Sequence, residues 1–202
     1  MKLYYSPGAC SLAPHIVLRE LGLPHTLVKV DIRAGKTEDG RAYRQVNPKG
    51  YVPAIELDDG ERLTEGAALL QYLADRKPAA GLAPANGTME RYRLQEWLNF
   101  IATEIHKGYA PLWRPDGTDD EKQRVRARLA TRLDWLAREL EGRDFVMGKQ
   151  FTVADAYLYT VLNWSPSTGV DLGRWNVLKD YVARVSARPK VQEALKAEGL
   201  LK

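Results

Sequence analysis

The pattern of apolar and polar positions changes character once along the chain. In the first part, short runs of strand composition alternate with segments of helical spacing. Residues 2–5 form an apolar-aromatic strand, Ser6-Pro7-Gly8 breaks it, and apolar residues then recur at helical spacing from 11 to 21. Strand composition returns over residues 26–32. This strand–helix–strand order favours a parallel pair of strands with a helix on one face.

The following residues continue the alternation. We expect a weaker, polar helix over 37–46 and a strand over 52–57 that opens at a proline. The turn signal Asp58-Asp59-Gly60 predicts a hairpin, with a return strand starting at 62–63 and a helix over 65–75. The predicted order β-α-β-α-β-β-α is sufficient for a small α/β domain.

The second part of the chain is helical throughout in its pattern. It follows a stretch rich in Pro, Gly and Ala that predicts a linker. Helices are expected over residues 88–110, 119–141, 153–165, 177–187 and 190–198. The sequence therefore predicts an α/β domain over residues 1–78, a linker over 79–87 and an all-α domain over 88–202.

Composition and charge exclude several classes of protein. Hydrophobic residues make up 45% and charged residues 28%, as in folded soluble proteins. No apolar run approaches the roughly 18 residues of a membrane span, and the first residues lack the apolar stretch of a signal peptide, so we expect a cytoplasmic protein without a membrane partner. Thirty Lys and Arg against 26 Asp and Glu give a net charge of only +4, which is weak evidence for nucleic acid, and we expect none. A single cysteine excludes an internal disulfide, and no metal is expected.

Cys10 is the first candidate for chemistry. It lies after a predicted strand and at the start of a predicted helix, where backbone N–H groups and the helix dipole stabilise an anion. A thiol in such a place can have a lowered pKa and be a thiolate near neutral pH. The alternative is a small buried apolar cysteine. Because there is no Cys-x-x-Cys, any disulfide chemistry needs an external thiol.

Two further segments are candidates for ligand binding. If the Val52-Pro53 peptide is cis, the N–H and C=O of Val52 face outward and suit an extended peptide ligand. At the opening of the next helix, N–H groups could hold a carboxylate and Glu65 could pair with an ammonium. The alternative for Glu65 is an ordinary acidic residue in a first helical turn.

Two helices of the second part carry informative polar residues. Gln95, Asn99, Thr103 and His106 form an uncharged polar flank, which suits either a cleft or a subunit interface. His106, with a reference pKa of about 6.5, could donate a hydrogen bond to a thiolate or accept a proton. Thr152 and Asp155 have capping-box spacing, which predicts a folding role.

Together these segments resemble one family over essentially the whole chain. The chain looks like a cytosolic glutathione S-transferase, most closely of the bacterial beta class. The resemblance implies a thioredoxin-like N-terminal domain, an all-helical C-terminal domain, a homodimer and glutathione as cosubstrate. It rests on residues 2–11, 47–53, 63–66 and 151–155.

The resemblance also implies roles for residues of the first domain. In the family, the residue at the Cys10 position faces the glutathione sulfur and can form a mixed disulfide with it. Val52, before a cis-proline matching Pro53, bonds the cysteinyl backbone of glutathione. The acidic residue matching Glu65 and the next residue, here Gly66, hold the γ-glutamyl end.

This chain departs from the family in two places. The family usually has Ser where this chain has Gly66, so a hydroxyl hydrogen bond of about 0.5–1.5 kcal/mol is lost. A family lysine that covers the glycyl carboxylate aligns with Gly35, and Lys36 is expected to replace it by a one-residue loop shift.

In the second domain, the resemblance implies that Asn99, Thr103 and His106 line the glutathione site. Cys10 and His106 are the predicted catalytic residues. The expected wall for a hydrophobic substrate is apolar and aromatic, and comprises Tyr109, Leu112, Trp113 and Trp164.

The predicted function is a glutathione transferase that conjugates the glutathione thiolate to hydrophobic electrophiles. Thiol–disulfide exchange or reductive dehalogenation through Cys10 is an additional activity to consider. The alternative from another class is a non-catalytic binding or interaction protein on the same scaffold.

Overall fold

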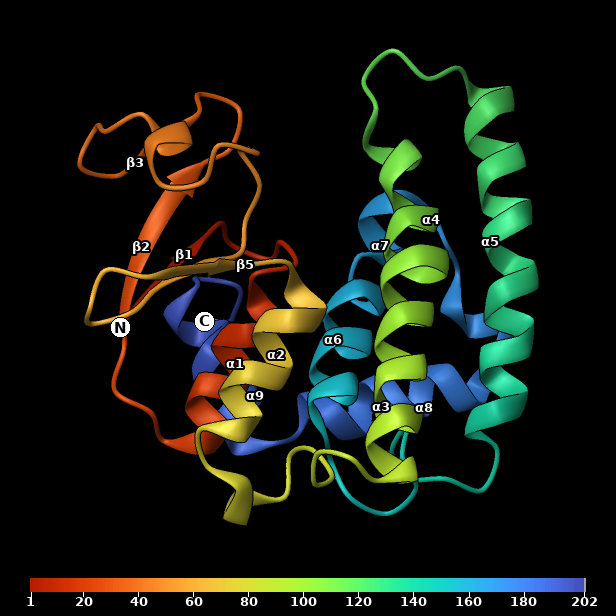
Figure 1. Cartoon of the computed structure of the whole chain (residues 1–202). Coiled ribbons are helices and arrows are strands. Elements are labelled where there is room, and N and C mark those ends of the chain that lie inside the picture. The colour runs from red at the N-terminus through yellow and green to blue at the C-terminus, as the bar shows by residue number, and fades with distance from the viewer. Residues whose placement is uncertain (202) are drawn as a thin grey trace. The chain divides into compact units, whose positions relative to one another are not determined.

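The structure is a computed structural model in which residues 1–201 are described. It divides into two compact units, and each is described by itself (Figure 1). Unit 1 comprises Met1–Ala80 and Ala187–Lys202, and unit 2 comprises Gly81–Ser186. The fold is that of a thioredoxin-like sheet domain with a helical domain, as the sequence predicts.

The sheet of unit 1 has five strands in the order β3-β2-β1-β4-β5. β1 and β2 are parallel, and the other neighbouring pairs are antiparallel. The predicted strand–helix–strand start of the chain is therefore confirmed. The strands are β1 (Lys2–Tyr5), β2 (Thr26–Asp31), β3 (Lys36–Thr37), β4 (Ala54–Glu56) and β5 (Arg62–Thr64).

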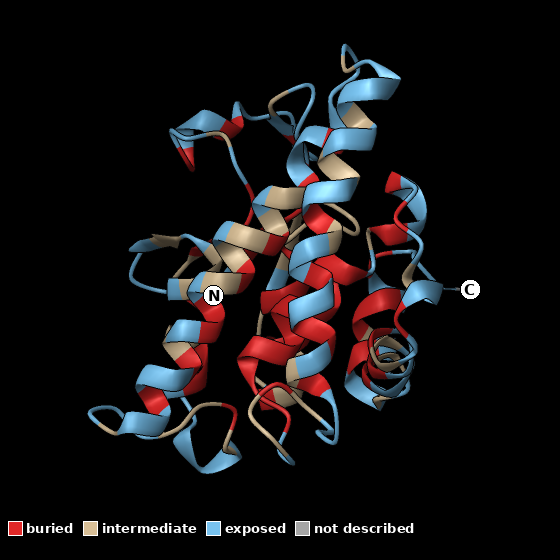
Figure 2. Ribbon diagram, turned by 90° about the vertical axis from the view of Figure 1, so that its right-hand side faces the viewer, coloured by how far each residue is buried: buried red, intermediate tan, exposed pale blue. Residues whose placement is uncertain are grey.

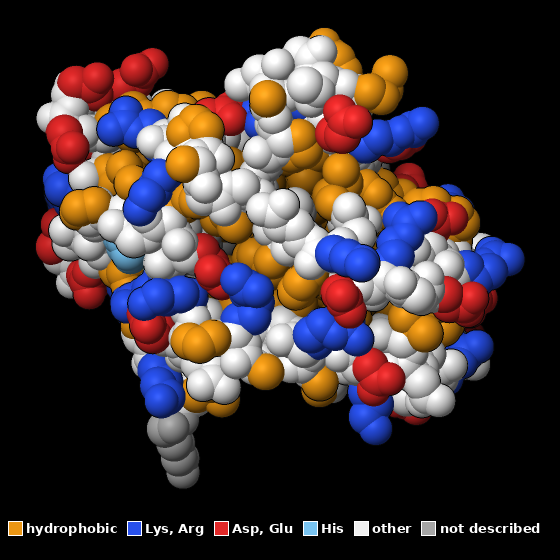
Figure 3. All heavy atoms as spheres, turned by 90° about the horizontal axis from the view of Figure 1, so that it is seen from below, with side chains coloured by type: hydrophobic (Ala, Val, Ile, Leu, Met, Phe, Trp, Pro, Cys, Tyr) orange, Lys and Arg blue, Asp and Glu red, His pale blue; other side chains and the backbone are white. Residues whose placement is uncertain are grey.

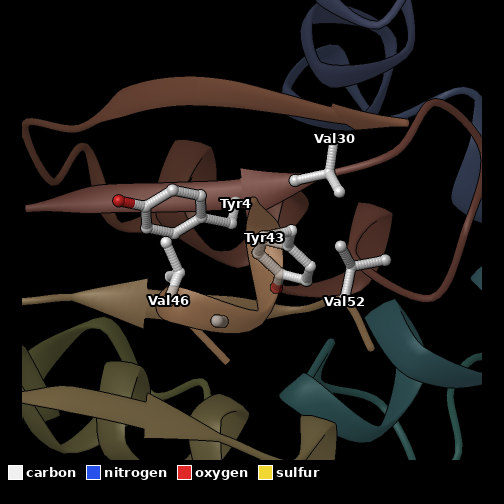
Figure 4. Packing of buried hydrophobic residues seen from close by; sticks show 6 residues of the cluster. Tyr4, Val30, Tyr43, Val46 and Val52 are labelled. Carbon is white, nitrogen blue, oxygen red and sulfur yellow. The ribbon is translucent and has the colours of Figure 1, made fainter. Parts of the chain in front are cut away.

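Both faces of this sheet are covered. On one face lie α1 (Leu12–Leu21), α2 (Gly66–Asp75) and α9 (Pro189–Ala197), with α1 packed against the other two helices (Figure 1). On the other face, Tyr43 of the short 3-10 helix η1 (Tyr43–Gln45) packs against Tyr4 with ring centroids 5.9 Å apart. Figure 4 shows the labelled residues of this cluster directed toward one another, Val52 among them. The core thus extends to the residue before the candidate proline.

The prediction of a helix over residues 37–46 is wrong. The segment contains the two-residue strand β3, a turn and η1. Gly40, at φ 84°, and a hydrogen bond from its N–H to Thr37 O (2.8 Å) form the turn. Asp39 adds side-chain bonds to Thr37 and to Arg41 Nε. These local polar interactions compete with helical bonds, and the weak apolar spacing does not overcome them.

The last helix belongs to unit 1, although the predicted all-helical domain runs to residue 202. α9 packs on α1, and Arg188 forms a two-bond ion pair with Glu20, with its Nε 2.8 Å from Oε1 and its second nitrogen 3.0 Å from Oε2. The limits 1–78 for the sheet domain and 88–202 for the all-helical domain remain a prediction. The compact units differ from them because α9 packs against α1 of unit 1.

Unit 2 is built around a buried helix, α6 (Val153–Leu162), whose residues are all buried. It packs against α3 (Met89–Phe100) and α8 (Asn176–Ser186). Figure 2 shows helices that are red along one face and pale blue along the other, as amphipathic spacing requires. The remaining helical segments of unit 2 are η3 (Ile101–His106), α4 (Lys107–Tyr109), η4 (Ala110–Trp113), α5 (Asp119–Leu140), α7 (Ser165–Thr168) and η5 (Leu172–Arg174).

The predicted capping box at the start of α6 is present. The buried Asp155 carboxylate accepts hydrogen bonds from Thr152 N–H (2.8 Å), Val146 N–H (2.7 Å) and the Tyr181 hydroxyl (2.9 Å). Burial raises the pKa of Asp155 to about 6, and these donors act in the opposite direction. The box fixes the start of α6 and ties it to α8.

Charged side chains of both signs are interspersed on the surface. Figure 3 shows Lys and Arg beside Asp and Glu over the face that it draws. On unit 2, Arg132 pairs with Glu104 at 2.6 Å and Arg93 with Glu96 at 2.8 Å. Within residues 1–201, no helix has the length and apolar character needed to cross a membrane.

Candidate active site

Cys10 sits at the end of a tight loop between β1 and α1. The buried Ser11 hydroxyl accepts from Ser6 N–H (3.1 Å) and donates to Ser6 O (3.2 Å), while Ala9 N–H donates to Ser6 O (3.0 Å). Ser11 is the N-cap residue of α1, so Cys10 is held just before the first turn of the helix. Its side chain is half-buried.

The structure brings Cys10 together with Val52. The Cys10 thiol donates to the Val52 carbonyl oxygen, with 3.1 Å between sulfur and oxygen. The Val52-Pro53 peptide bond is cis, and Val52 is 6% exposed. A thiol can donate this hydrogen bond, but a thiolate has no proton to donate. The contact with the Val52 carbonyl therefore stabilises the protonated form of Cys10 and not the expected thiolate.

Four candidate positions of unit 1 share one edge of the sheet. The C-terminal end of β1 leads to Cys10, and the antiparallel strand β4 starts at that same edge, just after Val52. β5 runs antiparallel to β4, with Thr64 opposite Ala54, so Glu65 also leaves the sheet there. Lys36 pairs with Asp31 at the end of β2 and is exposed. Ligands of open α/β sheets bind outside this kind of edge.

Glu65 has an unusual backbone. Its φ is 67° and its ψ is 113°, and among residues 1–201 it is the only residue other than glycine with a positive φ. Such conformations cost about 1–3 kcal/mol for a residue with a side chain and gather at functional sites. α2 starts at the next residue, Gly66, so the first N–H groups of this helix follow Glu65 directly in the chain.

Sequence reasoning missed Lys49. Its ammonium lies 2.5 Å from Glu65 Oε1 and 2.8 Å from Thr64 Oγ1. The sequence does show a lysine in the loop that leads to Val52. Its position beside Glu65, however, depends on the register of β4 and β5, which the sequence does not reveal.

Sequence reasoning also missed Glu198, which follows α9. Its carboxylate accepts from Gly8 N–H (2.9 Å) in the Cys10 loop and contacts His15 Nδ1 at 2.8 Å. Gly8 has φ 70°, and a Cβ there would meet Leu200 at 3.5 Å. No local signal in the sequence indicates a contact across 190 positions.

In unit 2, His106 is neutral at neutral pH. Burial lowers its pKa to about 4, and the Lys107 charge acts in the same direction. Its Nδ1 lies 2.7 Å from the Tyr157 hydroxyl. The ring is therefore a hydrogen-bonding group and not a cation or a strong base.

An aromatic group surrounds His106. The Trp164 ring lies 5.0 Å from His106, 6.0 Å from Tyr109 and 6.3 Å from Trp113, measured between centroids. Tyr109 is fully buried, and its hydroxyl lies 2.6 Å from Ser165 Oγ. Leu112 is buried, whereas Trp113 is 51% exposed. The accessible part of the predicted wall is thus Trp113 with the half-buried Trp164.

The expected single helix over 88–110 is interrupted by the π-helical segment η3. Thr103 and His106 lie in this segment, and Asn99 lies in the last turn of α3. Asn99 and Thr103 are exposed, and the Thr103 hydroxyl donates to Asn99 O at 3.0 Å. π-Helical turns are rare and frequent at functional sites, and their wider turn changes which residues share a face.

Among residues 1–201, no group of three or more His, Cys, Asp and Glu side chains is placed to hold a metal ion.

The order of unit 1, with Cys10 between β1 and α1 and a proline before β4, defines a thioredoxin-like domain joined to a helical domain. Comparison with known families agrees. Residues 8–76 match the glutathione S-transferase N-terminal domain, and residues 100–189 match the C-terminal domain of the same family. The chain belongs to the glutathione S-transferase family, which confirms the family and enzyme class predicted from the sequence.

Full-length relatives are similar throughout. The chain is 49% identical to glutathione S-transferase GstA of Escherichia coli O157:H7, over 99% of this chain and 100% of that protein. A sphingomonad glutathione S-transferase solved in complex with glutathione superimposes with a TM-score of 0.96 at 49% identity, over 100% of both chains. The beta-class enzyme of Sphingomonas chungbukensis gives 0.96 at 47% identity, also over 100% of both.

Proposed function

We propose that this protein transfers glutathione to hydrophobic electrophiles. The observation that carries the proposal is the joining of Cys10 to Val52 at the sheet edge where Glu65 and the N-terminus of α2 also lie. A tripeptide laid along this edge meets backbone groups in its middle and charged groups at one end. A non-catalytic binding protein is not favoured, since the full-length relatives are glutathione S-transferases.

Val52 is proposed to hold the central cysteinyl residue of glutathione. Its N–H is proposed to donate to a carbonyl of the ligand. Such main-chain bonding resembles the addition of a strand. It leaves the glutathione sulfur near Cys10. Lys36, Pro53, Gly66, Asn99, Thr103 and His106 remain predicted members of the glutathione site.

The nucleophile is proposed to be the sulfur of glutathione and not that of Cys10. In conjugation, the glutathione thiolate forms a bond to the electrophilic carbon, and the leaving group departs with the electron pair of the broken bond. The Cys10 thiol and the N-terminus of α1 are polar groups suited to stabilising that thiolate. Neutral His106 is suited to donating a hydrogen bond from its ring N–H.

The aromatic group of unit 2 is proposed to take the hydrophobic electrophile. Trp113 is exposed and lies beside Trp164, which in turn packs against the buried Tyr109; Leu112 is also buried. Neutral aromatic surfaces of this kind bind apolar rings without selecting one substrate.

Disulfide chemistry at Cys10 is a second proposed activity, favoured by the half-buried position of its sulfur at the sheet edge. Cys10 as a thiolate attacks oxidised glutathione. A Cys10–glutathione disulfide forms, and one glutathione thiolate leaves. A second glutathione then releases the adduct. Reductive dehalogenation would produce the same adduct. Glutathione displaces the halide from the substrate carbon, the Cys10 thiolate attacks the sulfur of that conjugate, and the carbon keeps the C–S electron pair and takes up a proton. A second glutathione releases Cys10, so that two glutathiones, oxidised to their disulfide, supply the two electrons.

A Cys10→Ala variant separates these activities. We expect it to lose the mixed disulfide, seen by mass spectrometry after incubation with oxidised glutathione, and to keep part of the conjugation of glutathione to 1-chloro-2,4-dinitrobenzene. Complete loss of conjugation in a folded variant would assign thiolate stabilisation to Cys10 itself. A wild-type protein whose melting temperature does not shift with millimolar glutathione would contradict the proposed function.

We also propose a homodimer, which the resemblance implies, and a cytoplasmic location, which the sequence pattern predicts. Light scattering on the purified chain tests the oligomeric state.

A further inference from the structure

The ion pair between Lys49 and Glu65 lies at the sheet edge but contributes little to holding the fold together. The Lys49 side chain is 46% exposed and that of Glu65 is 70% exposed. Ion pairs this open to solvent add little to stability, because water screens them and both side chains lose freedom. The pair therefore calls for another explanation than folding.

Both partners nevertheless stand on backbone that is closely fixed. Glu65 is held at positive φ, which opposes any residue with a side chain. Lys49 N–H donates to Asn47 Oδ1 at 3.2 Å, and Gly50 N–H donates to Asn47 O at 2.8 Å. Arg44 also fixes this loop through Pro48 O at 2.7 Å. The two charges are thus carried at set positions, which a simple surface ion pair does not require.

The charges match those at one end of glutathione. Its γ-glutamyl group carries an ammonium and a carboxylate on the same carbon atom. Glu65 offers a partner for the ammonium, yet an unaccompanied carboxylate there would repel the ligand's own carboxylate. The neighbouring position is Gly66, which has no hydroxyl to offer that carboxylate. Lys49, already beside Glu65, is a cation within reach of it.

We propose that Lys49 binds the α-carboxylate of the γ-glutamyl group and, with Glu65, forms a paired receptor for both charges of that group. This inference rests on the proposed function, because it assigns one end of the glutathione site. When glutathione binds, the Lys49 ammonium gives up part of its contact with Glu65 and pairs with the α-carboxylate of the ligand. The Glu65 carboxylate then pairs with the ammonium of the ligand. In this chain the lysine supplies the contact that Gly66 lacks.

The test compares three ligands by isothermal titration calorimetry. They are glutathione, 4-aminobutyryl-Cys-Gly, which lacks only the α-carboxylate, and glutaryl-Cys-Gly, which lacks only the ammonium. Lys49→Met should weaken glutathione binding about tenfold and leave the binding of 4-aminobutyryl-Cys-Gly within twofold of wild type. In conjugation assays the loss should appear in the KM for glutathione, with kcat nearly unchanged.

Two further variants sharpen the test. Gly66→Ser in the Lys49→Met background should recover part of the glutathione affinity by supplying a hydroxyl. Lys190→Met is the matched control, since Lys190 is also 46% exposed and pairs with Glu193 at 2.7 Å in α9. It should bind all three ligands as wild type does.

Two results would overturn the assignment of Lys49. Unchanged or tighter glutathione binding by Lys49→Met would show that Lys49 is only an internal counter-ion of Glu65. An equal loss for glutathione and 4-aminobutyryl-Cys-Gly would show that it acts through the position of Glu65. Failure of the proposed function has a different signature, because the wild-type protein would then bind none of the three ligands.

Discussion

The candidate residues of unit 1 and those of unit 2 differ in whether their titratable groups are charged. In unit 1, Lys49 and Glu65 are exposed and paired. In unit 2, burial keeps titratable groups neutral, lowering the pKa of His106 to about 4 and raising that of Tyr109 to about 12. The first arrangement suits a charged tripeptide and the second an apolar electrophile. Under the proposed function, the two substrates would thus meet two chemically distinct surfaces of one chain.

The two groups also differ in how they are held. The Cys10 loop of unit 1 is fixed by hydrogen bonds, including the one from Gly8 N–H to Glu198. The His106 group of unit 2 is fixed mainly by ring packing, with Tyr157 and Trp164 set edge-on to the imidazole. Variants that remove one kind of support should therefore give different signatures.

The largest effect is expected for Glu198→Ala. The change leaves buried His15 and Gly8 N–H without their acceptor, and should lower the free energy of unfolding by roughly 3–4 kcal/mol. Urea denaturation measures this loss, and the KM for glutathione should rise with it because the Cys10 loop is released.

Glu193→Ala, within the helix that Glu198 follows, is the control for Glu198→Ala. Its carboxylate is 44% exposed and pairs with Lys190, so we expect less than about 1 kcal/mol. Equal stability of Glu198→Ala and wild type would mean that the last helix does not support the loop.

His106 should give unit 2 a pH dependence of its own. The pKa is about 6.5 when unfolded and about 4 when folded, so the unfolded chain takes up the proton first as the pH falls. Its contribution to stability is complete above pH 6.5 and falls by about 3 kcal/mol as the pH drops to 4.

The measurement is the difference in unfolding free energy between wild type and His106→Gln over this pH range. Other titrating groups cancel in that difference. A difference independent of pH would mean that His106 is open to water, and the contrast with unit 1 would disappear.

The smallest effect concerns the backbone of Glu65. Glu65→Gly and Glu65→Ala both remove the carboxylate, and both should weaken glutathione binding. Only glycine accepts φ 67° without strain, so the Gly variant should be more stable than the Ala variant by about 1 kcal/mol, after its extra chain entropy is subtracted. Thermal unfolding compares the two, and equal stabilities would argue against strain at this position.

Local patterns predicted most elements of the fold. The spacing of apolar residues identified α1 and α5, and Thr152 with Asp155 identified the start of α6. The prediction of a helix over 37–46 is wrong because hydrogen bonds of short polar side chains favour a turn there. The π-helical segment η3 was not predicted because apolar spacing does not distinguish a wider turn within a long helix.

The candidate site depended more on resemblance than on pattern. Cys10 and Val52 are 42 positions apart, and only the pairing of β1 with β4 brings them together. Lys49 and Glu198 were not found because each acts through a partner that sequence spacing does not reveal. These contacts are determined by the register of distant strands and by tertiary packing.

The bond between Gly8 and Glu198 has a consequence for biosynthesis. The ribosome makes Gly8 of the Cys10 loop 190 positions before it makes the carboxylate partner of that residue. During translation this loop therefore emerges without Glu198, and its bond to that carboxylate can form only after residue 198 has left the ribosome.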